Sequence, residues 1–471
     1  MNAPELAPPP PPVTGGWRVL RAVENLFVIV PLALSVGLPL LEVVLRRFHT
    51  GLTGSITLVQ NLTLIIGIAG AAIAAREVRL LSFSTVSSFL RGRLKTGARL
   101  LSSGVAAAIS AVLCAASFQF LLTEKQAGGR LVGDIPDWAV ELALPLGFGL
   151  IALRLVWHVG PRWRDRGVAL ALAAAIILFG VFSPVDPGAC VVPGLVALLV
   201  ATVCGAPVFT AIGGAALILF WGDGSPIAAI PLKHHSLVTS SSLPTIPLFT
   251  LAGYFLAESG ASQRLIRVFQ ALLGSLRGGP AIVTALVCAF FTTFTGASGV
   301  TILALGGLLL PVLRSARYSE RDALGLLTGA GSLGLLFPPC LPVILYSIIA
   351  GTTLANLGTA NVSVNSVTLQ KMFLGGLVPG MVMVGLTAWW GVRRQPREAV
   401  SRQPFDAREA RRALWTAKWE LMLPVVALAA LFGGFATPIE AAAITAAYAL
   451  LITTAIHRDL RPFRDLPRVL V

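Results

Sequence analysis

Long apolar segments alternate with short polar stretches along most of this 471-residue chain. In the first third, the pattern predicts membrane-crossing helices at residues 24–45, 51–75, 98–122 and 137–158. Each segment has about 20 residues or more, the length that an α-helix needs to cross a bilayer. With 55% hydrophobic and 12% charged residues, the chain is expected to be an all-α, polytopic membrane protein.

Basic residues are concentrated in alternate loops of this first region. Eleven lie in the N-terminal tail, in residues 76–99 and in the stretch after residue 158, whereas the intervening loops hold four. Because cytoplasmic loops retain Lys and Arg, the N-terminus and the end of this region are both expected in the cytoplasm. Loop clusters thus account for the net charge of +15, and no nucleic-acid partner is expected.

The most unusual pattern lies between Arg277 and Arg314, where no residue is charged. Two apolar arms, at about residues 280–294 and 299–314, flank a polar tip of small residues. At 1.5 Å per residue each arm spans about 22 to 24 Å, which is short for a bilayer crossing. A re-entrant helical hairpin fits these lengths better than two full spans, and the flanking charges are compatible with either.

A second interruption runs from Gly334 to Pro339, inside an apolar region that extends to residue 351. A helix cannot continue through two adjacent prolines, because they remove amide donors and clash with the preceding turn. Unpaired backbone inside a bilayer is tolerated only where protein or a watery cavity satisfies it. The hairpin tip and this broken helix therefore predict a site with oxygen ligands for sodium and helix N-termini for an anion.

These segments also carry a family resemblance. TGASGVTILALGGLLLP and GSLGLLFPPCLPVILY are similar to the first half of the large membrane subunit of tripartite ATP-independent periplasmic (TRAP) transporters. Residues 1–160 resemble the small four-helix membrane subunit, on GLPLLEVVLRRF and GAAIAAREVRLLSFST. The resemblance implies a small-subunit-like unit at 1–160, a linker with one extra transmembrane helix at 161–189, and a large-subunit-like transport region at 190–471. It also implies about 11 to 13 membrane segments and an elevator-type transporter.

The resemblance implies a function as well. The chain is expected to be a membrane component of a sodium-coupled secondary transporter in the bacterial inner membrane, and not an enzyme. A periplasmic substrate-binding protein would deliver an organic acid such as a dicarboxylate, and sodium would be the coupling ion without any cofactor. The match assigns sodium binding to these residues: Thr295, Gly296, Ser298, Gly334, Phe337 and Pro339. Cys340 replaces the serine that is common after the two prolines, and a thiol is a poor sodium ligand.

Other interpretations stay open at this point. Small residues at the tip could merely permit tight helix packing. A channel or a permease subunit without ion coupling would have similar apolar segments. An intramembrane enzyme would need paired catalytic side chains inside them, whereas every histidine lies at a segment end or in a loop. The five cysteines have no paired spacing, so no metal beyond sodium is expected.

The repeat structure raises a further expectation. Transporters of this architecture use two inverted repeats, each with a hairpin and a broken helix. The sequence contains one of each, so we expect the first repeat alone, from a truncated or split protein. A separate chain would then supply the second repeat, or the product would be a non-functional half-transporter.

Two local motifs predict charged contacts at helix ends. Glu42 and Arg46 are four residues apart, which favours an ion pair along one helix. Thr437 and Glu440 form a capping-box pattern with Pro438 at the first helical position. Structural roles are expected for both, with a contact to another part of the transporter as the alternative for Glu42 and a substrate-pathway role for Glu440.

Overall fold

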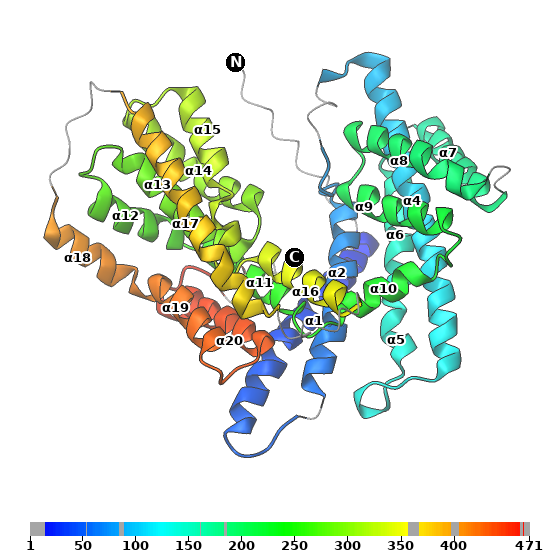
Figure 1. The fold of residues 1–471 in the computed structure, drawn as a ribbon, viewed down its shortest axis with the longest axis horizontal. Helices are drawn as coiled ribbons and strands as arrows, with labels where there is room; N and C mark the ends of the chain where they lie inside the picture. The colour runs from blue at the N-terminus through cyan, green and yellow to red at the C-terminus, as the bar shows by residue number, and fades with distance from the viewer. Residues whose placement is uncertain are drawn as a thin grey trace. The chain divides into compact units, whose positions relative to one another are not determined.

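The computed structural model describes residues 15–52, 54–83, 89–160, 162–182, 186–356, 367–396, 405–461 and 465, and it is almost entirely helical there (Figure 1). In these ranges, β-structure is limited to two isolated bridges. The helices form two compact units, Met1–Pro31 with Leu64–His234 and Leu32–Thr63 with His235–Leu470. The expected all-α, polytopic fold is confirmed.

The first unit is built around a long central helix. It comprises the first part of α1 (Gly15–Arg46), the last part of α2 (Ser55–Arg76), α4 (Gly92–Ala127), η1 (Val132–Asp134), α5 (Asp137–Glu141), α6 (Ala143–Trp157), α7 (Trp163–Phe182), α8 (Pro187–Val203), α9 (Val208–Gly222) and most of α10 (Ala229–Val238). Helix α4 packs against α6, α7, α8 and α9. Buried alanines at 106, 107 and 108 let its neighbours approach closely.

A charged cluster joins three helices of this unit. Arg76 of α2 donates to the Glu24 carboxylate of α1 over 2.7 Å, and Arg154 of α6 donates to the other oxygen of the same carboxylate. Arg154 also donates to the Ala72 carbonyl over 2.6 Å. These side chains are 13 to 17% exposed, so the paired charges compensate one another in a largely desolvated place.

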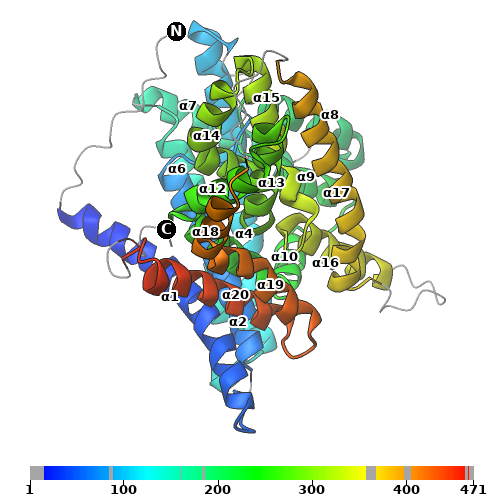
Figure 2. The ribbon, with the colours of Figure 1, turned by 90° about the vertical axis from the view of Figure 1, so that its left-hand side faces the viewer.

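The second unit is built around α13. It comprises the rest of α1, α2 and α10, followed by α11 (Thr245–Ala257), α12 (Ala261–Leu273), α13 (Gly279–Thr295), α14 (Ser298–Ser315), α15 (Glu320–Ala330), η2 (Leu333–Leu336), α16 (Leu341–Asn356), α17 (Leu369–Arg394), α18 (Ala407–Thr416), α19 (Lys418–Phe432), α20 (Pro438–Leu451) and η4 (Ile452–Ile456). Helix α13 packs against α11, α12, α14, α15, α17 and η2. Figure 2 shows α12, α14, α15 and α17 around it. Phe291 and Phe294 of α13 are almost fully buried there.

Several helices have the length and composition of membrane spans. Within the described residues there are eight such helices, or up to ten if each of two bent pairs counts as one span. Four shorter apolar helices add to these: Pro187–Val203, Val208–Gly222, Thr245–Ala257 and Gly279–Thr295. The number of about 11 to 13 membrane segments includes short and re-entrant ones, and it stays a prediction.

The local predictions agree closely with the observed elements. The two arms become α13 and α14, and the expected Pro-Pro break separates helices that bend by 44°. The capping box forms, because the Thr437 side chain accepts from the Glu440 amide while Glu440 accepts from the Thr437 amide.

Candidate functional site

The hairpin tip is a two-residue turn between α13 and α14. Gly296 ends α13 with φ +64°, a left-handed conformation that glycine adopts without strain, and its amide donates to the Thr292 carbonyl over 2.9 Å. Ala297 is extended, and α14 begins at Ser298 without a side-chain cap. The C-terminus of one apolar helix and the uncapped N-terminus of the next therefore meet at the tip.

The broken helix supplies the second corner. Helix α15 ends at Ala330, a single 3₁₀ turn follows at Leu333–Leu336, and Phe337 is extended with ψ 140° before the two prolines. Helix α16 then begins at Leu341. The chain thus leaves α-helical geometry over residues 331–340, which frees backbone carbonyls from the α-helical ladder.

The two corners lie against each other. A Cβ atom at Gly296 would be 2.5 Å from the Leu341 Cβ atom, so the tip touches the start of α16. Gly334 lies directly on the α13 backbone, where a Cβ atom would overlap the Ala289 carbonyl and the Thr293 amide. Only residues without side chains permit these contacts, so the glycines bring tip and break together.

Three buried threonines form a hydroxyl cluster at this junction. The Thr292 Oγ1 atom lies 2.9 Å from Thr301 Oγ1, which lies 3.0 Å from Thr295 Oγ1. Thr292 Oγ1 is also 2.8 Å from the carbonyl oxygens of both Cys288 and Gly331. The three side chains are at most 1% exposed. We call Thr292, Thr295, Thr301 and the Gly331 carbonyl the threonine cluster.

The threonine cluster has the chemistry of a hard-cation site. Its members are neutral oxygen donors, and it lies beside the C-terminus of α13, whose carbonyl dipoles favour positive charge. A thiol lies nearby in the chain, but Cys340 is fully buried and its Sγ atom is 2.6 Å from the Leu335 carbonyl. The thiol therefore donates to the Leu335 carbonyl and is not a member of the threonine cluster, which agrees with its poor suitability as a sodium ligand.

The residues predicted at the hairpin tip have different surroundings in the structure. Thr295 belongs to the threonine cluster. Ser298 is half-buried at the start of α14, and its carbonyl would lie 3.3 Å from a Cβ atom on Gly331. The tip glycine, Gly296, packs on the start of α16.

The carbonyls expected at the break take part in turns. The Gly334 carbonyl accepts from the Phe337 amide over 3.1 Å and lies 3.4 Å from Thr293 Oγ1, while the Phe337 carbonyl accepts from Cys340 over 2.9 Å. Pro339 follows in a cis peptide with Pro338. A second lone pair remains on the Phe337 carbonyl. Their role in sodium binding stays a prediction.

Sequence reasoning missed Thr301 and the Gly331 carbonyl and did not assign Thr292 to the site. A signal for Thr301 exists, because a polar residue one turn into an otherwise apolar arm faces the other arm when the hairpin closes. No local signal marks Gly331, since its carbonyl is freed only by the way α15 ends.

Comparison with known proteins identifies the family. Residues 195–471 match the family described as "Tripartite ATP-independent periplasmic transporter, DctM component", and residues 35–165 match the corresponding DctQ component. The chain belongs to the TRAP transporter family, with small-subunit and large-subunit components fused in one polypeptide.

Relatives with described transport roles agree with this. The chain is 31% identical over 338 residues to the isethionate TRAP transporter permease protein DctMQ of Oleidesulfovibrio alaskensis, covering 69% of this chain and 50% of that protein. It is 32% identical over 285 residues to the C4-dicarboxylate TRAP transporter large permease protein DctM of Rhodobacter capsulatus, covering 60% of this chain and 64% of that protein. The C4-dicarboxylate TRAP transporter large permease protein DctM of Vibrio cholerae is 33% identical over 267 residues, covering 56% of this chain and 55% of that protein.

Two consequences follow from these matches. The relatives are transport permeases, so at the level of the family the expectation of a transporter and not an enzyme is confirmed. The chain spans about half to two thirds of the length of these relatives, 50 to 64%.

Proposed function

We propose that this chain is the membrane component of a sodium-coupled transporter that takes up an organic anion. The observation that carries the proposal is the threonine cluster, in which oxygen atoms from both hairpin arms and from the broken helix converge in a buried, uncharged place. Sodium would be bound as a transported ion by Thr292, Thr295 and Thr301 with the Gly331 carbonyl. Gly296, Ser298 and the carbonyls of Gly334, Phe337 and Pro339, which belong to the same two corners of the chain, would complete the site.

An ion at this position would also favour an anionic substrate. The uncapped N-terminus of α14 presents free backbone amides close to the tip. Such amides carry partial positive charge and stabilise carboxylates or sulfonates. The relatives are described for C4-dicarboxylate and isethionate, which are organic anions of these two kinds. We therefore propose a carboxylate or related organic acid as the substrate.

The driving force is sufficient without ATP. A sodium ion that enters down a membrane potential of about 100 mV releases about 2.3 kcal/mol. A tenfold sodium gradient adds about 1.4 kcal/mol. Two sodium ions per monoanion would then leave about 5 kcal/mol for accumulation after the charge of the anion is moved against the potential.

The remaining features of the proposal concern the assembly. A periplasmic substrate-binding protein, a general partner in this family, would deliver the substrate to a chain in the bacterial inner membrane with a cytoplasmic N-terminus. Residues 161–189 would link a small-subunit-like unit at 1–160 to the transport region at 190–471. Helix α7 and the unmatched residues 166–194 support this division. The hairpin-bearing part would move in an elevator-type cycle.

Sodium binding to the purified full chain tests the proposal most directly. Thermal unfolding in sodium chloride should occur at higher temperature than in potassium or choline chloride, because a ligand of the folded state stabilises it by mass action. Ser298→Ala should shift the sodium concentration needed for this effect to higher values. Ser315→Ala, at the exposed far end of the same helix, is the matched control.

Uptake measurements complete the test. Labelled organic acids should accumulate in proteoliposomes only when sodium and the binding protein are both present. Equal stabilisation by sodium, potassium and choline, or sodium-independent flux that does not saturate, would contradict the proposal and favour a channel.

A further inference from the structure

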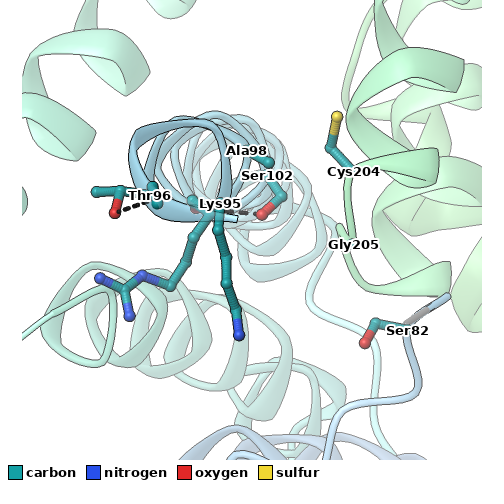
Figure 3. Close-up of a pocket in the computed structure, with 9 residues that line it drawn as sticks. Ser82, Lys95, Thr96, Ala98, Ser102, Cys204 and Gly205 are labelled. Carbon is teal, nitrogen blue, oxygen red and sulfur yellow. Dashed lines mark hydrogen bonds between the residues drawn. The ribbon is translucent and has the colours of Figure 1, made fainter. Parts of the chain in front are cut away.

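A pocket in the first unit lies far along the chain from the threonine cluster and has different chemistry. It is lined by Ser82, Gly92, Lys95, Thr96, Ala98, Arg99, Ser102, Cys204 and Gly205, and it has a volume of about 270 Å³ (Figure 3). The start of α4 forms one wall, and the turn between α8 and α9 forms another. Ser82 is held beside this turn, because the Val208 amide donates to the Leu81 carbonyl over 2.8 Å.

The lining is cationic. It contains the side chains of Lys95 and Arg99, one turn apart on α4, and no carboxylate. Figure 3 shows Lys95 extending from α4 into the space bordered by the segments of Ser82 and Gly205. The one acidic residue in positions 76–102 is Glu77, which accepts from Arg76 over 3.0 Å. Two cations without a facing carboxylate make the pocket selective for an anion.

Hydroxyl and backbone groups complete a phosphate-like environment. The pocket includes the first turn of α4, whose N-cap residue Arg91 makes no side-chain capping bond. The first-turn amides of this 36-residue helix are therefore available to oxygen atoms of a ligand. Thr96 and Ser102 add hydroxyls, although both already donate to backbone carbonyls of their own helix.

Exposed apolar side chains lie near the start of α4, beside the residues that line the pocket. Leu94 is 71% exposed on α4, and Phe89 and Phe83 just before it are 79% and 58% exposed. Arg91 and Arg93 are exposed among them. Apolar side chains interleaved with arginines are typical of the level where lipid headgroups meet acyl chains. The positive-inside pattern puts this end of α4 at the cytoplasmic leaflet.

We propose that this pocket binds the phosphate of an anionic phospholipid, with Lys95 and Arg99 as its charged ligands. The apolar residues around it would contact the acyl chains. Basic pockets between transmembrane helices are a recurring form of lipid recognition. A volume of about 270 Å³ is small for a complete organic ligand, but it suits a headgroup whose chains remain outside.

Lipid binding to the delipidated full chain tests this proposal. Native mass spectrometry or a fluorescent-lipid titration should show tighter binding of phosphatidylglycerol than of phosphatidylcholine. In Lys95→Gln/Arg99→Gln the affinity for phosphatidylglycerol should fall by about 30-fold, the effect of losing two basic groups near an anionic headgroup. Arg162→Gln/Arg164→Gln removes the same charge from exposed positions in the same unit and should change it little.

Two further arms keep the test decisive. Lys95→Arg/Arg99→Lys retains both charges and should retain binding even if the neutral pair folds poorly. Phosphatidylglycerol should also slow the reaction of Cys204 with a maleimide, because Cys204 lines the pocket, while Cys190 reacts unchanged.

Specific results would overturn the proposal. An equal loss of phosphatidylglycerol affinity in Arg162→Gln/Arg164→Gln would mean that overall charge, and not this pocket, attracts the lipid. If inorganic phosphate alone protects Cys204 and phosphatidylglycerol does not, the site takes a soluble phosphate and the lipid assignment is wrong. Equal binding of phosphatidylcholine and phosphatidylglycerol would exclude recognition of the negative charge.

Discussion

The threonine cluster contains more hydrogen-bond acceptors than hydroxyl hydrogens that could bond to them. Thr292 has one hydroxyl hydrogen, yet its Oγ1 atom lies 2.8 Å from two carbonyl oxygens and 2.9 Å from Thr301 Oγ1. One hydrogen satisfies a single acceptor, so lone pairs in this buried group remain without donors. A bound cation would supply what is missing, because it would interact with several oxygen lone pairs at once. The surplus of acceptors is the residue-scale argument for an ion site.

Thr301→Val tests that argument. Valine keeps the shape of threonine but removes the hydroxyl that lies between Thr292 and Thr295. An oxygen facing a charged group contributes about 1.5 to 3 kcal/mol, so the sodium affinity should fall by about 10- to 100-fold. The measurement is the sodium concentration that gives half-maximal thermal stabilisation.

Thr284→Val is the matched control for this variant. Thr284 lies on α13, is fully buried, and its hydroxyl donates to the Pro280 carbonyl over 2.8 Å without reaching the cluster. Its substitution should lower general stability while leaving sodium affinity unchanged. If both valine variants lower sodium affinity equally, the effect belongs to packing in α13 and the assignment of Thr301 fails.

At the scale of elements, glycines set how closely helices approach the hairpin tip. Gly253 of α11 faces the backbone of α13 at Phe294 and Thr295, where a Cβ atom would lie 2.7 to 2.9 Å from backbone atoms. Backbone cannot rotate away as a side chain can. A methyl group at this position must therefore displace the last turn of α13, which carries Thr295.

Gly253→Ala is therefore expected to disturb the site from outside it. The forced shift should destabilise the chain by about 1 to 3 kcal/mol and weaken sodium binding, because Thr295 moves relative to Thr301. Gly307→Ala on α14, where a Cβ atom would meet nothing within 4 Å, should be neutral or slightly stabilising. Unchanged sodium affinity in Gly253→Ala would show that α11 does not position the tip.

A polar junction ties α12 to the chain after η4. Arg264 donates to Asp459 over 2.7 Å and to the buried Glu420 over 2.6 Å, and the Gly260 amide donates to Asp459 over 3.0 Å. His457 faces Glu420 from the same segment as Asp459. Partial burial acts against the Asp459 carboxylate, but the hydrogen bonds and charge of Arg264 prevail and lower the pKa of Asp459 below 3.8.

The pH dependence of stability follows from the sign of this shift. A carboxylate with a lowered pKa in the folded state stabilises it fully above the unfolded pKa and loses this contribution as the pH falls through the folded pKa. For a partly exposed pair the contribution should be about 1 kcal/mol. Thermal unfolding measured from about pH 6 to pH 3 should show this loss in the native chain but less of it in Asp459→Asn. If the stability of the native chain and of Asp459→Asn fell equally with pH, the lowered pKa of Asp459 would be contradicted.

At the scale of the whole molecule, the ion pair between Arg46 and Glu440 connects the two family components. Arg46 lies in the region that matches the small subunit, and Glu440 lies in the region that matches the large one. Both belong to the second compact unit, where Arg46 donates to both carboxylate oxygens of Glu440 and lies 3.6 Å from Glu42. Glu440 is 1% exposed and also accepts from the Thr437 amide over 2.7 Å. The capping box of α20 therefore doubles as the attachment point for α1.

A double-mutant cycle on Arg46→Met and Glu440→Gln tests this joint. Arg46→Met leaves the buried Glu440 carboxylate without its cation and should destabilise the chain by about 2 to 3 kcal/mol. Adding Glu440→Gln should recover part of that loss. The check is thermal unfolding of the two single variants and the double variant. Strictly additive effects would mean that the two side chains do not interact.

Much of the local structure could be predicted from the sequence. The arms at 280–294 and 299–314, the Pro-Pro break and the capping box at Thr437 all depend on neighbouring residues, because helix length, proline sterics and capping are local effects. The family motifs lie in the same segments, so membership could also be recognised there. Of the predicted sodium ligands, Thr295 was assigned from the local motif and lies in the threonine cluster.

The composition of the cluster depended on tertiary packing. Thr292 and Thr301 meet only when the hairpin closes, and the Gly331 carbonyl joins them only when α15 lies against α13. The same holds for Arg46 and Glu440, which are 394 positions apart. The residues themselves determined where helices begin, end and break, since those effects act within a few positions. Which polar atoms face one another was decided by packing, since it depends on distances that no local pattern encodes.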